Sequence, residues 1–295
     1  MQGSSCHEPT SLANHPVGLA GPMPRIPWIL ATVLAYISLV AGCTSATRTS
    51  PGTGLVSLHP SITSTLVSLG AAEQLVGRSA HCSEPEVSRL PPMGHELAPT
   101  LEPLAALHPE AILVSGSEGA RLDQLGALAP VESYPWLDVA QMVQSVRALG
   151  RRTGTVDAAD RLAAKLEQGL TGPAKAHAPS ALLIISTEAD GSVWFMQPNS
   201  IHGAALRAGG FANAVSETVT GPPRMGVEEL LRRDPEHLIL LVDATADIEA
   251  ATAPISALRP LAAVQQQRVH VLAGAFLGTG PEILELADRI GKIPR

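Results

Sequence analysis

Two segments of this chain have nearly the same pattern, and the glutamates that begin them, Glu102 and Glu228, are 126 residues apart. In each segment a short helical stretch follows the glutamate, a Pro-Glu pair comes seven residues later at Pro109 or Pro235, and an apolar run starts at once. Proline cannot continue a helix and biases the preceding residue toward extended geometry, so each segment predicts a helix, a break and a strand. The repeat therefore predicts two similar α/β lobes with a cleft between them.

The strands of this repeat are expected to be parallel and buried on both faces. The apolar runs Ala111–Val114 and Leu238–Val242 contain no alternating polar residues. Uninterrupted apolar strands are typical of parallel sheets that carry helices on both sides. The sequence thus predicts an α/β protein of two Rossmann-like lobes with mainly parallel sheets.

A long helical stretch separates the two predicted lobes. Apolar residues recur at helical spacing between Val139 and Leu170, with Gly154 between the two runs. An α-helix rises about 1.5 Å per residue, so this stretch is long enough to join the lobes as a stiff backbone with a limited hinge. The expected parts are a signal peptide (1–42), a lipidated tether (43–54), an N-terminal lobe (55–137), a linking helix (138–172) and a C-terminal lobe (173–295).

The first residues have the layout of a secretory leader. Ile26–Val40 is an apolar run too short for a typical membrane span, and small residues lead from it into Cys43. This arrangement is typical of a lipoprotein cleavage site, where Cys43 becomes the acylated N-terminus of an extracytoplasmic, membrane-anchored protein. An ordinary signal peptide and a single anchor helix are the alternatives, and either Met1 or Met23 could be the initiator.

Composition and missing motifs narrow the class of protein. With Cys6 removed and Cys43 acylated, Cys82 has no partner for an intramolecular disulfide. The net charge of −7 and the lack of basic segments with interleaved aromatic residues argue against nucleic-acid binding. The His-Glu-x-x-His, Gly-x-Ser-x-Gly and nucleotide-binding glycine signatures are absent, so we expect neither an enzyme nor a resident cofactor.

Four side chains of the first lobe follow predicted strands or precede a predicted helix: His59, His81, Cys82 and His95. Ligands of open α/β sheets bind outside the carboxyl ends of the strands, so these residues are candidates for lining one site. Imidazole and thiolate groups bind transition metals or the axial position of a haem or corrinoid. Their spacing matches no compact metal motif, and polar loop residues satisfied by the backbone are the alternative interpretation.

Three further residues are candidates for ligand contact. Trp136 and Trp194 can stack on a flat macrocycle or, alternatively, close the cores of the lobes. Arg224 can pair with a carboxylate or phosphate of the ligand, or lie on the surface. His108 and His237 flank the Pro-Glu breaks at the other ends of the strands, where we expect solvated positions.

Several motifs occur in the order in which one protein family has them. They are Val56–Gly70, Leu75–Ser79, Gly94 with Leu101–Glu110, Ala208–Asn213, Glu228–Glu236 and Gly280–Glu282. With them the chain resembles ABC-transporter substrate-binding proteins for cobalamin, haem and iron-siderophores. The resemblance implies two lobes joined by a helical backbone, and a small metal chelate bound in the cleft. It also implies one glutamate per lobe that docks on the permease, at positions matching Glu102 and Glu228.

The resemblance further implies the partners and the ligand class. The expected partners are an ABC permease with its ATPase and, through the lipid anchor, the membrane, with the protein itself a monomer. Val76–Cys82 looks most like the cobalamin branch of the family, so a cobalamin-like corrinoid is favoured, and haem or a ferric siderophore is the alternative. Of other classes, a secreted metalloenzyme using His59, His81 and His95 and a tethered ligand sensor remain open.

Replacing Cys43 with serine is expected to abolish lipidation and release the protein into the soluble fraction, because the acyl chains are the only membrane anchor that the sequence predicts. Cell fractionation and labelling with palmitate measure this directly. A Cys43→Ser protein that still sediments with membranes and takes up the label would contradict the lipoprotein prediction.

Overall fold

A computed structural model describes residues 54–116, 120–172, 177–256, 258–274 and 278–295. These residues belong to one compact unit, Thr49–Arg295. The predicted signal peptide, Cys43 and all but the last residue of the predicted tether lie outside the described residues. Within the described ranges, no helix has both the length and the apolar character needed to cross a membrane.

The N-terminal lobe contains a four-stranded parallel sheet with the strand order β2-β1-β5-β6. Its strands are β1 (Leu55–Ser57), β2 (Leu75–Gly77), β5 (Ala111–Val114) and β6 (Val131–Ser133). β1 and β5 lie in the middle of the sheet and every one of their residues is buried. Burial on both faces, as predicted, therefore explains the uninterrupted apolar run of β5, and β6 is an edge strand.

Helices cover both faces of this sheet. They are α2 (Pro60–Ser68), α3 (Leu101–Leu107) and α4 (Leu122–Gly126), with two short 3₁₀ helices (Ala72–Gln74 and Pro85–Val87) and a hairpin of β3 (Gly94–His95) and β4 (Ala98–Pro99). α3 and α4 pack on the outer face through Leu104 and Leu125, whereas α2 packs on the inner face through Ile62. α2 begins at Pro60, with His59 as its N-cap residue. Proline suits the first helical position, where no backbone N–H is needed.

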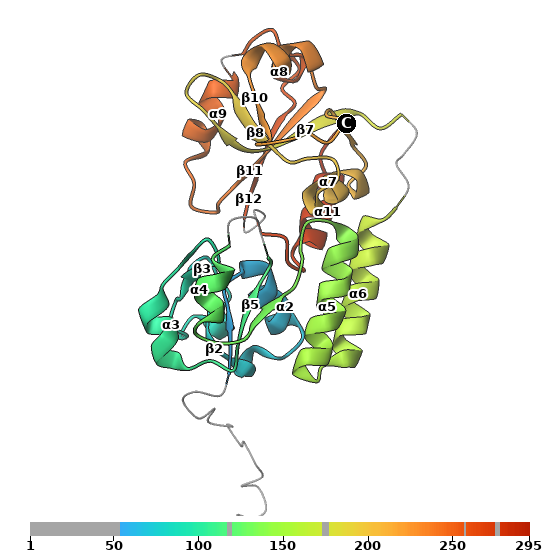
Figure 1. The fold of residues 1–295 in the computed structure, drawn as a ribbon. Helices are drawn as coiled ribbons and strands as arrows, with labels where there is room; N and C mark the ends of the chain where they lie inside the picture. Colours follow the sequence, from blue (N-terminus) through green and yellow to red (C-terminus); the bar gives the residue numbers. More distant parts are fainter. Residues whose placement is uncertain (1–53, 117–119, 173–176, 257, 275–277) are drawn as a thin grey trace, which may run out of the picture. The chain divides into compact units, whose positions relative to one another are not determined.

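The helical link between the lobes consists of two helices instead of one continuous strut (Figure 1). α5 (Val139–Thr153) and α6 (Val156–Leu170) pack against each other along their lengths. Gly154 ends α5 in the left-handed conformation (φ 74°), which a glycine adopts without steric cost, and the chain then turns back. The helices approach closely because Gly150 has no side chain: a Cβ there would lie 2.2 Å from that of Ala159.

The C-terminal lobe contains a six-stranded mixed sheet, with the order β10-β8-β7-β11-β12 and β9 paired to β7. Its strands are β7 (Ser180–Thr187), β8 (Val193–Phe195), β9 (Ala212–Asn213), β10 (Arg224–Met225), β11 (His237–Val242) and β12 (Val269–Ala273). The pairs β9–β7, β7–β11 and β11–β12 are parallel. The pairs β7–β8 and β8–β10 are antiparallel. The prediction of mainly parallel sheets in two α/β lobes is confirmed.

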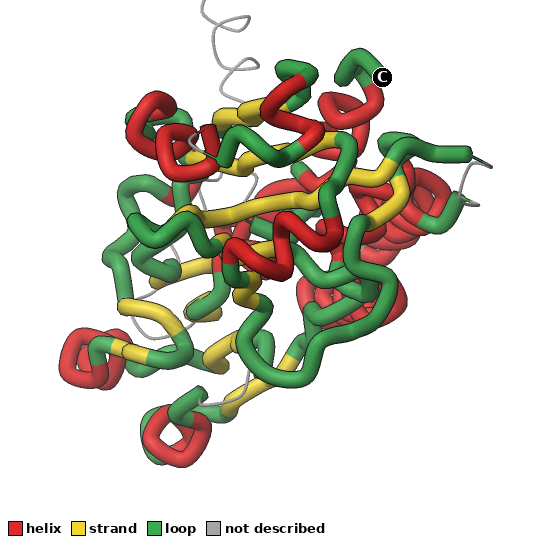
Figure 2. The backbone as a smooth tube through the Cα atoms, turned by 90° about the horizontal axis from the view of Figure 1, so that it is seen from above, coloured by secondary structure: helices red, strands yellow, loops and turns green. Residues whose placement is uncertain are grey.

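Helices also cover both faces of the second sheet, so that the strands lie between red helical segments in Figure 2. The helices are α7 (Ile201–Ala208), α8 (Val227–Arg233), α9 (Ile248–Ser256), α10 (Ala262–Gln265) and α11 (Ile283–Gly291). α8 and α9 share a core with one face of the sheet, and α7 and α11 share a core with the other. Ser200 caps α7, with its Oγ accepting a hydrogen bond from Gly203 N (3.0 Å), and Glu282 is the N-cap residue of α11.

The structure confirms the repeated helix–break–strand unit in detail. α3 and α8 each have seven residues, and each ends at a residue in the left-handed conformation, His108 (φ 48°) or Asp234 (φ 40°). Buried Pro109 and Pro235 follow, and β5 and β11 start two residues after them. The residue before a proline is disfavoured in the right-handed helical region, which ends both helices at the same point of the unit.

His237 contradicts its predicted place on the solvated surface. Its side chain is completely buried at the start of β11, because β11 is a central strand and its first residue faces the core. The Nδ1 of His237 lies 3.1 Å from Nε2 of His270 on the neighbouring β12, and the edge of the ring contacts Phe211. Burial lowers the pKa of both imidazoles below 6.5, and the positive charges of Arg268 and, for His237, of His270 act in the same direction.

This histidine pair is expected to make the folded state less stable in mild acid. The unfolded chain binds protons at the ordinary histidine pKa of 6.5 and the folded chain only at lower pH, so the free energy of unfolding falls as the pH drops below about 6.5. His237→Asn should reduce the loss of stability between about pH 7.5 and about pH 5.5, measured by urea unfolding. His177→Asn, at an exposed histidine, is the matched control. An unchanged pH dependence for His237→Asn would show that the pair does not titrate as proposed.

Candidate functional site

The carboxyl edge of the N-terminal sheet brings two of the predicted ligand residues together. His81 follows β2, and His95 is the last residue of β3 in the β3–β4 hairpin. Their ring centroids are 5.2 Å apart and the rings are tilted by 44°. His81 is exposed and His95 is half-buried, so at least one imidazole of the pair is open to solvent.

Backbone pairing between the hairpin and the segment after β2 explains this contact. Met93 N donates to Arg78 O and Ala80 N donates to Gly94 O, both at 2.8 Å. Gly94 has a positive φ of 76°, and a Cβ there would lie 2.3 Å from the carbonyl oxygen of Ala98. The tight turn therefore needs glycine, and it sets the position of His95 against the segment that carries His81. The sequence contained no alternation that would have predicted a hairpin of two-residue strands.

His59, which follows β1, and Glu96, which follows His95 in the hairpin, are two further polar residues at this edge. Glu96 is 4% exposed, and its carboxylate accepts from Ser115 N (2.7 Å) and Ser115 Oγ (2.5 Å) at the carboxyl end of β5. The Nδ1 of His59 is buried and has no hydrogen-bond partner among the described residues. Burial lowers the pKa of His59, and the negative charge of Glu96 opposes that shift. Sequence reasoning predicted His59 but gave Glu96 no part in ligand binding.

Cys82 lies at the same edge but is a poor candidate for metal binding. It is half-buried and forms no disulfide within the described part of the chain. Burial raises the pKa of its thiol, and a hydrogen bond with the Thr63 side chain only partly offsets this. Because the thiolate is the form that binds metals, the surroundings of Cys82 favour the unreactive thiol.

A segment of the C-terminal lobe reaches the N-terminal lobe close to these residues. Thr279 follows β12, and its Oγ1 lies 2.8 Å from Ser61 Oγ in the first turn of α2. The carbonyl oxygen of Thr279 accepts from Nε1 of Trp136 at 2.6 Å. Trp136 is 6% exposed and packs in the core, which corresponds to the alternative that it closes the core of a lobe and is not an open stacking surface.

Trp194 and Arg224 lie opposite each other in the register of β8 and β10. Trp194 is half-buried near the carboxyl end of β7, and its Nε1 donates to Glu188 at 2.9 Å. Arg224 belongs to β10, and its guanidinium donates to Ser192 Oγ (2.6 Å) and Asp190 (3.1 Å). The second lobe thus offers one partly accessible indole, and its arginine already has an acidic partner.

The predicted candidates do not form a metal centre on their own. Among the described residues, no group of three or more His, Cys, Asp or Glu side chains could hold a metal ion. His59, His81 and His95 are all described, so the metalloenzyme alternative lacks the three-histidine site that it requires. The arrangement can instead offer one or two imidazoles to a metal that arrives within a chelate.

Glu102 and Glu228 occupy the same place on the two lobes. Each is an exposed residue in the first turn of a seven-residue helix, α3 or α8. Neither forms an ion pair within the described part of the chain. In parallel α/β units such helices begin at the carboxyl edge of the sheet, so both carboxylates lie at the edge that carries the candidate ligand residues.

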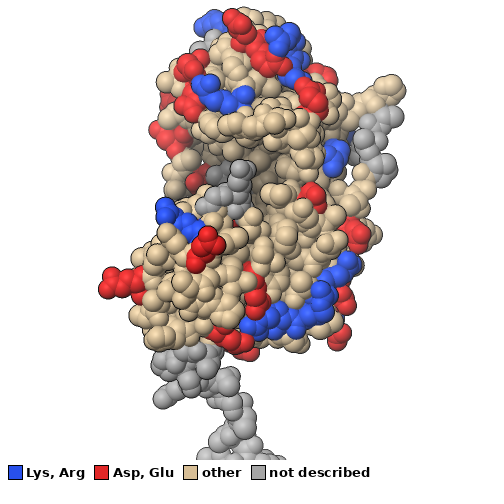
Figure 3. Space-filling model, in the orientation of Figure 1, with Lys and Arg blue, Asp and Glu red and all other residues tan. Residues whose placement is uncertain are grey.

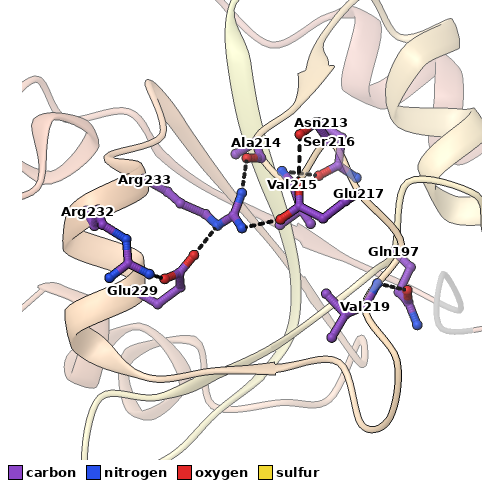
Figure 4. A network of polar contacts seen from close by, with 10 residues as sticks. All are labelled: Gln197, Asn213, Ala214, Val215, Ser216, Glu217, Val219, Glu229, Arg232 and Arg233. Atoms are coloured by element: carbon purple, nitrogen blue, oxygen red, sulfur yellow. Dashed lines mark hydrogen bonds and ion pairs between the residues drawn. The ribbon is translucent and has the colours of Figure 1, made fainter.

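Glu229, the neighbour of Glu228, is held within the protein (Figure 4). Its carboxylate pairs with Arg232 and with Arg233, whose Nε donates at 2.6 Å. Arg233 also pairs with Glu217 (2.5 Å) and donates to the carbonyl oxygen of Ala214 (3.2 Å). This network joins α8 to the segment after β9, and it leaves Glu228 as the carboxylate that is open to a partner.

On the face in Figure 3, basic side chains form one short stripe low in the view with acidic side chains beside it, and elsewhere charges of both signs are scattered. Nucleic-acid-binding surfaces gather basic residues on one face or along one helix. The stripe is short and has acidic neighbours, so the displayed face carries no extended basic field.

A family model described as "Periplasmic binding protein" matches residues 55–273, nearly the whole described chain. A search of curated proteins gave no match. Solved structures with the same fold include one from Pseudomonas aeruginosa, one from Listeria monocytogenes and one from Vibrio cholerae. A periplasmic haem-binding protein from Pseudomonas aeruginosa is 25% identical with a TM-score of 0.67, and the match covers 81% of this chain and 91% of that protein.

The other two structures are more distant in sequence. An ABC-transporter substrate-binding protein from Listeria monocytogenes is 18% identical with a TM-score of 0.68, over 83% of this chain and 98% of that one. A periplasmic vitamin B12-binding protein from Vibrio cholerae is 16% identical with a TM-score of 0.66, over 82% and 96%. The resemblance inferred from the sequence motifs is thereby confirmed at the level of family and fold.

Proposed function

Because the chain belongs to the periplasmic binding protein family, we propose that it is the extracytoplasmic substrate-binding lipoprotein of an ABC importer for a metal tetrapyrrole. Relatives of this fold include a haem-binding and a vitamin B12-binding protein. The protein captures its ligand between the carboxyl edges of the two sheets and delivers it to the permease. Cys43 supplies the lipid anchor, and no chemical step is needed.

The contact between His81 and His95 carries the assignment of the ligand class. Imidazole is a common axial ligand of haem iron. The pair lies at the carboxyl edge, where ligands of open α/β sheets bind, and His81 is exposed. Trp194 on the other lobe offers a half-buried ring for stacking on a flat macrocycle. These observations favour a flat metal tetrapyrrole over a siderophore, and the similarity to a haem-binding protein at 25% identity supports haem ahead of the corrinoid that the sequence favoured.

A cobalamin-like corrinoid is the second candidate. The segment Val76–Cys82 resembles the cobalamin branch of the family, and this segment contributes His81 to the candidate site. A corrinoid also presents a flat ring and a metal ion, so the same side chains would contact it. A ferric siderophore has no flat ring and would depend less on Trp194.

Titration of the purified Cys43→Ser protein with haemin, cyanocobalamin and ferrichrome, followed by absorbance, tests this function. We expect haemin to bind with a shifted Soret band. His81→Asn and His95→Asn should each weaken binding by at least the roughly 10–100-fold that loss of an outer-shell metal partner costs. His108→Asn, at the far end of α3, is the control and should bind normally. Binding of ferrichrome alone would move the ligand to siderophores, and binding of none of the three would overturn the function.

We further propose that Glu102 and Glu228 dock the protein on the permease. They are exposed, repeat at the same position of each lobe and form no ion pair within the described residues. Arginine is the expected partner, because a guanidinium pairs with a carboxylate through two parallel hydrogen bonds. Such charges at the rim of an interface contribute mainly to steering and register.

The double variant Glu102→Lys, Glu228→Lys should bind ligand with unchanged affinity but should not support uptake in cells, because like charges then face each other at the docking surface. Glu285→Lys is the matched control. It removes an exposed first-turn acid from α11, so it tests whether loss of the favourable helix-end charge alone impairs transport. Normal uptake by the double variant, or a loss of ligand binding, would exclude the docking role.

A further inference from the structure

Exposed aliphatic side chains recur at one place in the two lobes. Leu122 begins α4 and is 41% exposed, and Ile248 begins α9 and is 47% exposed. α4 follows β5 and α9 follows β11, so the two residues occupy equivalent positions in the repeat. Their separation of 126 residues is also that of Glu102 and Glu228. Each lobe therefore carries an exposed aliphatic residue and an exposed carboxylate at the same spacing along the chain.

The cores do not require these two aliphatic side chains. Leu125 in α4 and Ile255 in α9 are fully buried and fill the outer cores, whereas the first residue of each helix points to solvent. The next residue is an exposed acid in both cases, Asp123 and Glu249. A single exposed leucine is ordinary on a soluble protein. An aliphatic-acid pair that recurs beside an unpaired carboxylate in both lobes is better explained by a partner.

In the N-terminal lobe, hydrogen bonds hold the exposed apolar residues in one group. The N-lobe patch consists of Leu97 (45% exposed), Leu101 (36% exposed), Glu102 and Leu122. Arg121, the residue before α4, donates from its backbone N–H and from Nε to carbonyl oxygens in the β3–β4 turn. α3 begins directly after the other strand of this hairpin, with Thr100 N donating to Met93 O at 3.0 Å. The starts of α3 and α4 thus flank one hairpin.

In the C-terminal lobe, the turn after β7 has the corresponding role. The C-lobe patch consists of Glu228 and Ile248. Thr187, at the end of β7, donates its Oγ1–H to the carbonyl oxygen of Ala251 in α9 at 2.9 Å. The same turn lies against the first residue of α8, since a Cβ on Gly191 would come within 2.9 Å of Val227 Cγ2. The starts of α8 and α9 therefore meet at one turn, as those of α3 and α4 do in the other lobe.

We propose that the N-lobe patch and the C-lobe patch are a duplicated docking surface, in which Leu122 and Ile248 are the apolar anchors beside Glu102 and Glu228. The inference rests on the proposed function, and its partner is the extracytoplasmic face of the permease. That face presents the same site twice, each with a cationic side chain next to an apolar pocket. When the permease covers an anchor, that aliphatic side chain leaves water. It then also shields the ion pair between the neighbouring glutamate and the permease from solvent.

Charge distinguishes this occupant from a second copy of the chain. A symmetric dimer through either patch would bring the same acidic surface against itself. Glu102 with Asp123, or Glu228 with Glu249, would then face like charges, which disfavours association. A partner with cations at two equivalent sites satisfies both patches.

Site-specific photo-crosslinking in the cells that make the full-length protein tests the proposal. p-Benzoylphenylalanine is placed at position 122 or 248, at 102 or 228 to mark the docking glutamates, and at 156 as control. Val156 is 45% exposed like the anchors, but it begins α6 in the helical link. We expect positions 122 and 248 to crosslink to the same ABC permease polypeptide as positions 102 and 228. Position 156 should give no crosslink to the permease.

The alternative outcomes separate this inference from the function on which it rests. Capture of a permease from 102 and 228 but not from 122 and 248 would overturn the anchors and leave the function intact. Capture of none from any position would overturn both. Crosslinks from 122 and 248 only to a second copy of the chain would assign the patches to self-association and reject the proposal.

Substitution measures the contribution of the anchors. The double variant Leu122→Ser, Ile248→Ser should lower uptake about tenfold or more, the loss expected if the two side chains are the energetically dominant apolar contacts, with ligand affinity unchanged. Val156→Ser is the matched control and should transport normally. Because both anchors are exposed, these variants are expected to fold, and unchanged urea unfolding would verify this. Normal uptake by the double variant would refute the proposal.

Discussion

One apolar core joins the two lobes, and the arrangement of the other elements depends on it. The core begins at the inner face of the N-terminal sheet, with Leu55 and Leu113, passes through α5 and α6, and ends between α7, α11 and the C-terminal sheet. Each sheet has a second, separate core on its outer face. Close-packed cores resist continuous deformation, so a change in the angle between the lobes would have to disrupt this shared packing. Small motions on ligand binding are therefore expected.

The chemistry of the candidate site follows from where polar residues can lie in such a fold. The central strands of the N-terminal sheet are buried on both faces, and the candidate residues His59, His81, Cys82 and His95 follow strands or lie in the hairpin at the carboxyl edge. Burial there lowers the pKa of His59 and raises that of Cys82, which keeps both groups neutral near pH 7. These two neutral groups lie at the same edge as the buried carboxylate of Glu96.

The repeated helix–proline–strand unit gives the two lobes similar surfaces. Proline ends α3 and α8 at the same point, and the following strands place the next helix start, α4 or α9, at the same edge. The two lobes differ in the charged residues near these helices. In the second lobe Arg233 holds Glu229 and Glu217, and the hydrogen bond with Ser216, followed by that with Arg233, lowers the pKa of Glu217 to about 2. The neighbouring Glu228 stays outside that network.

The sequence alone determined the α/β class, the parallel buried strands, the repeat and the family, because apolar runs and proline breaks act over a few residues. It could not determine contacts between residues distant in sequence. The turn at Gly154 makes two packed helices from the predicted strut, His237 pairs with His270 in the core, and a two-residue-strand hairpin brings His95 to His81. Trp136 likewise donates a hydrogen bond to Thr279, which lies near the other end of the chain. These features depend on which surfaces meet once the chain is compact, and that is decided by packing across the whole fold.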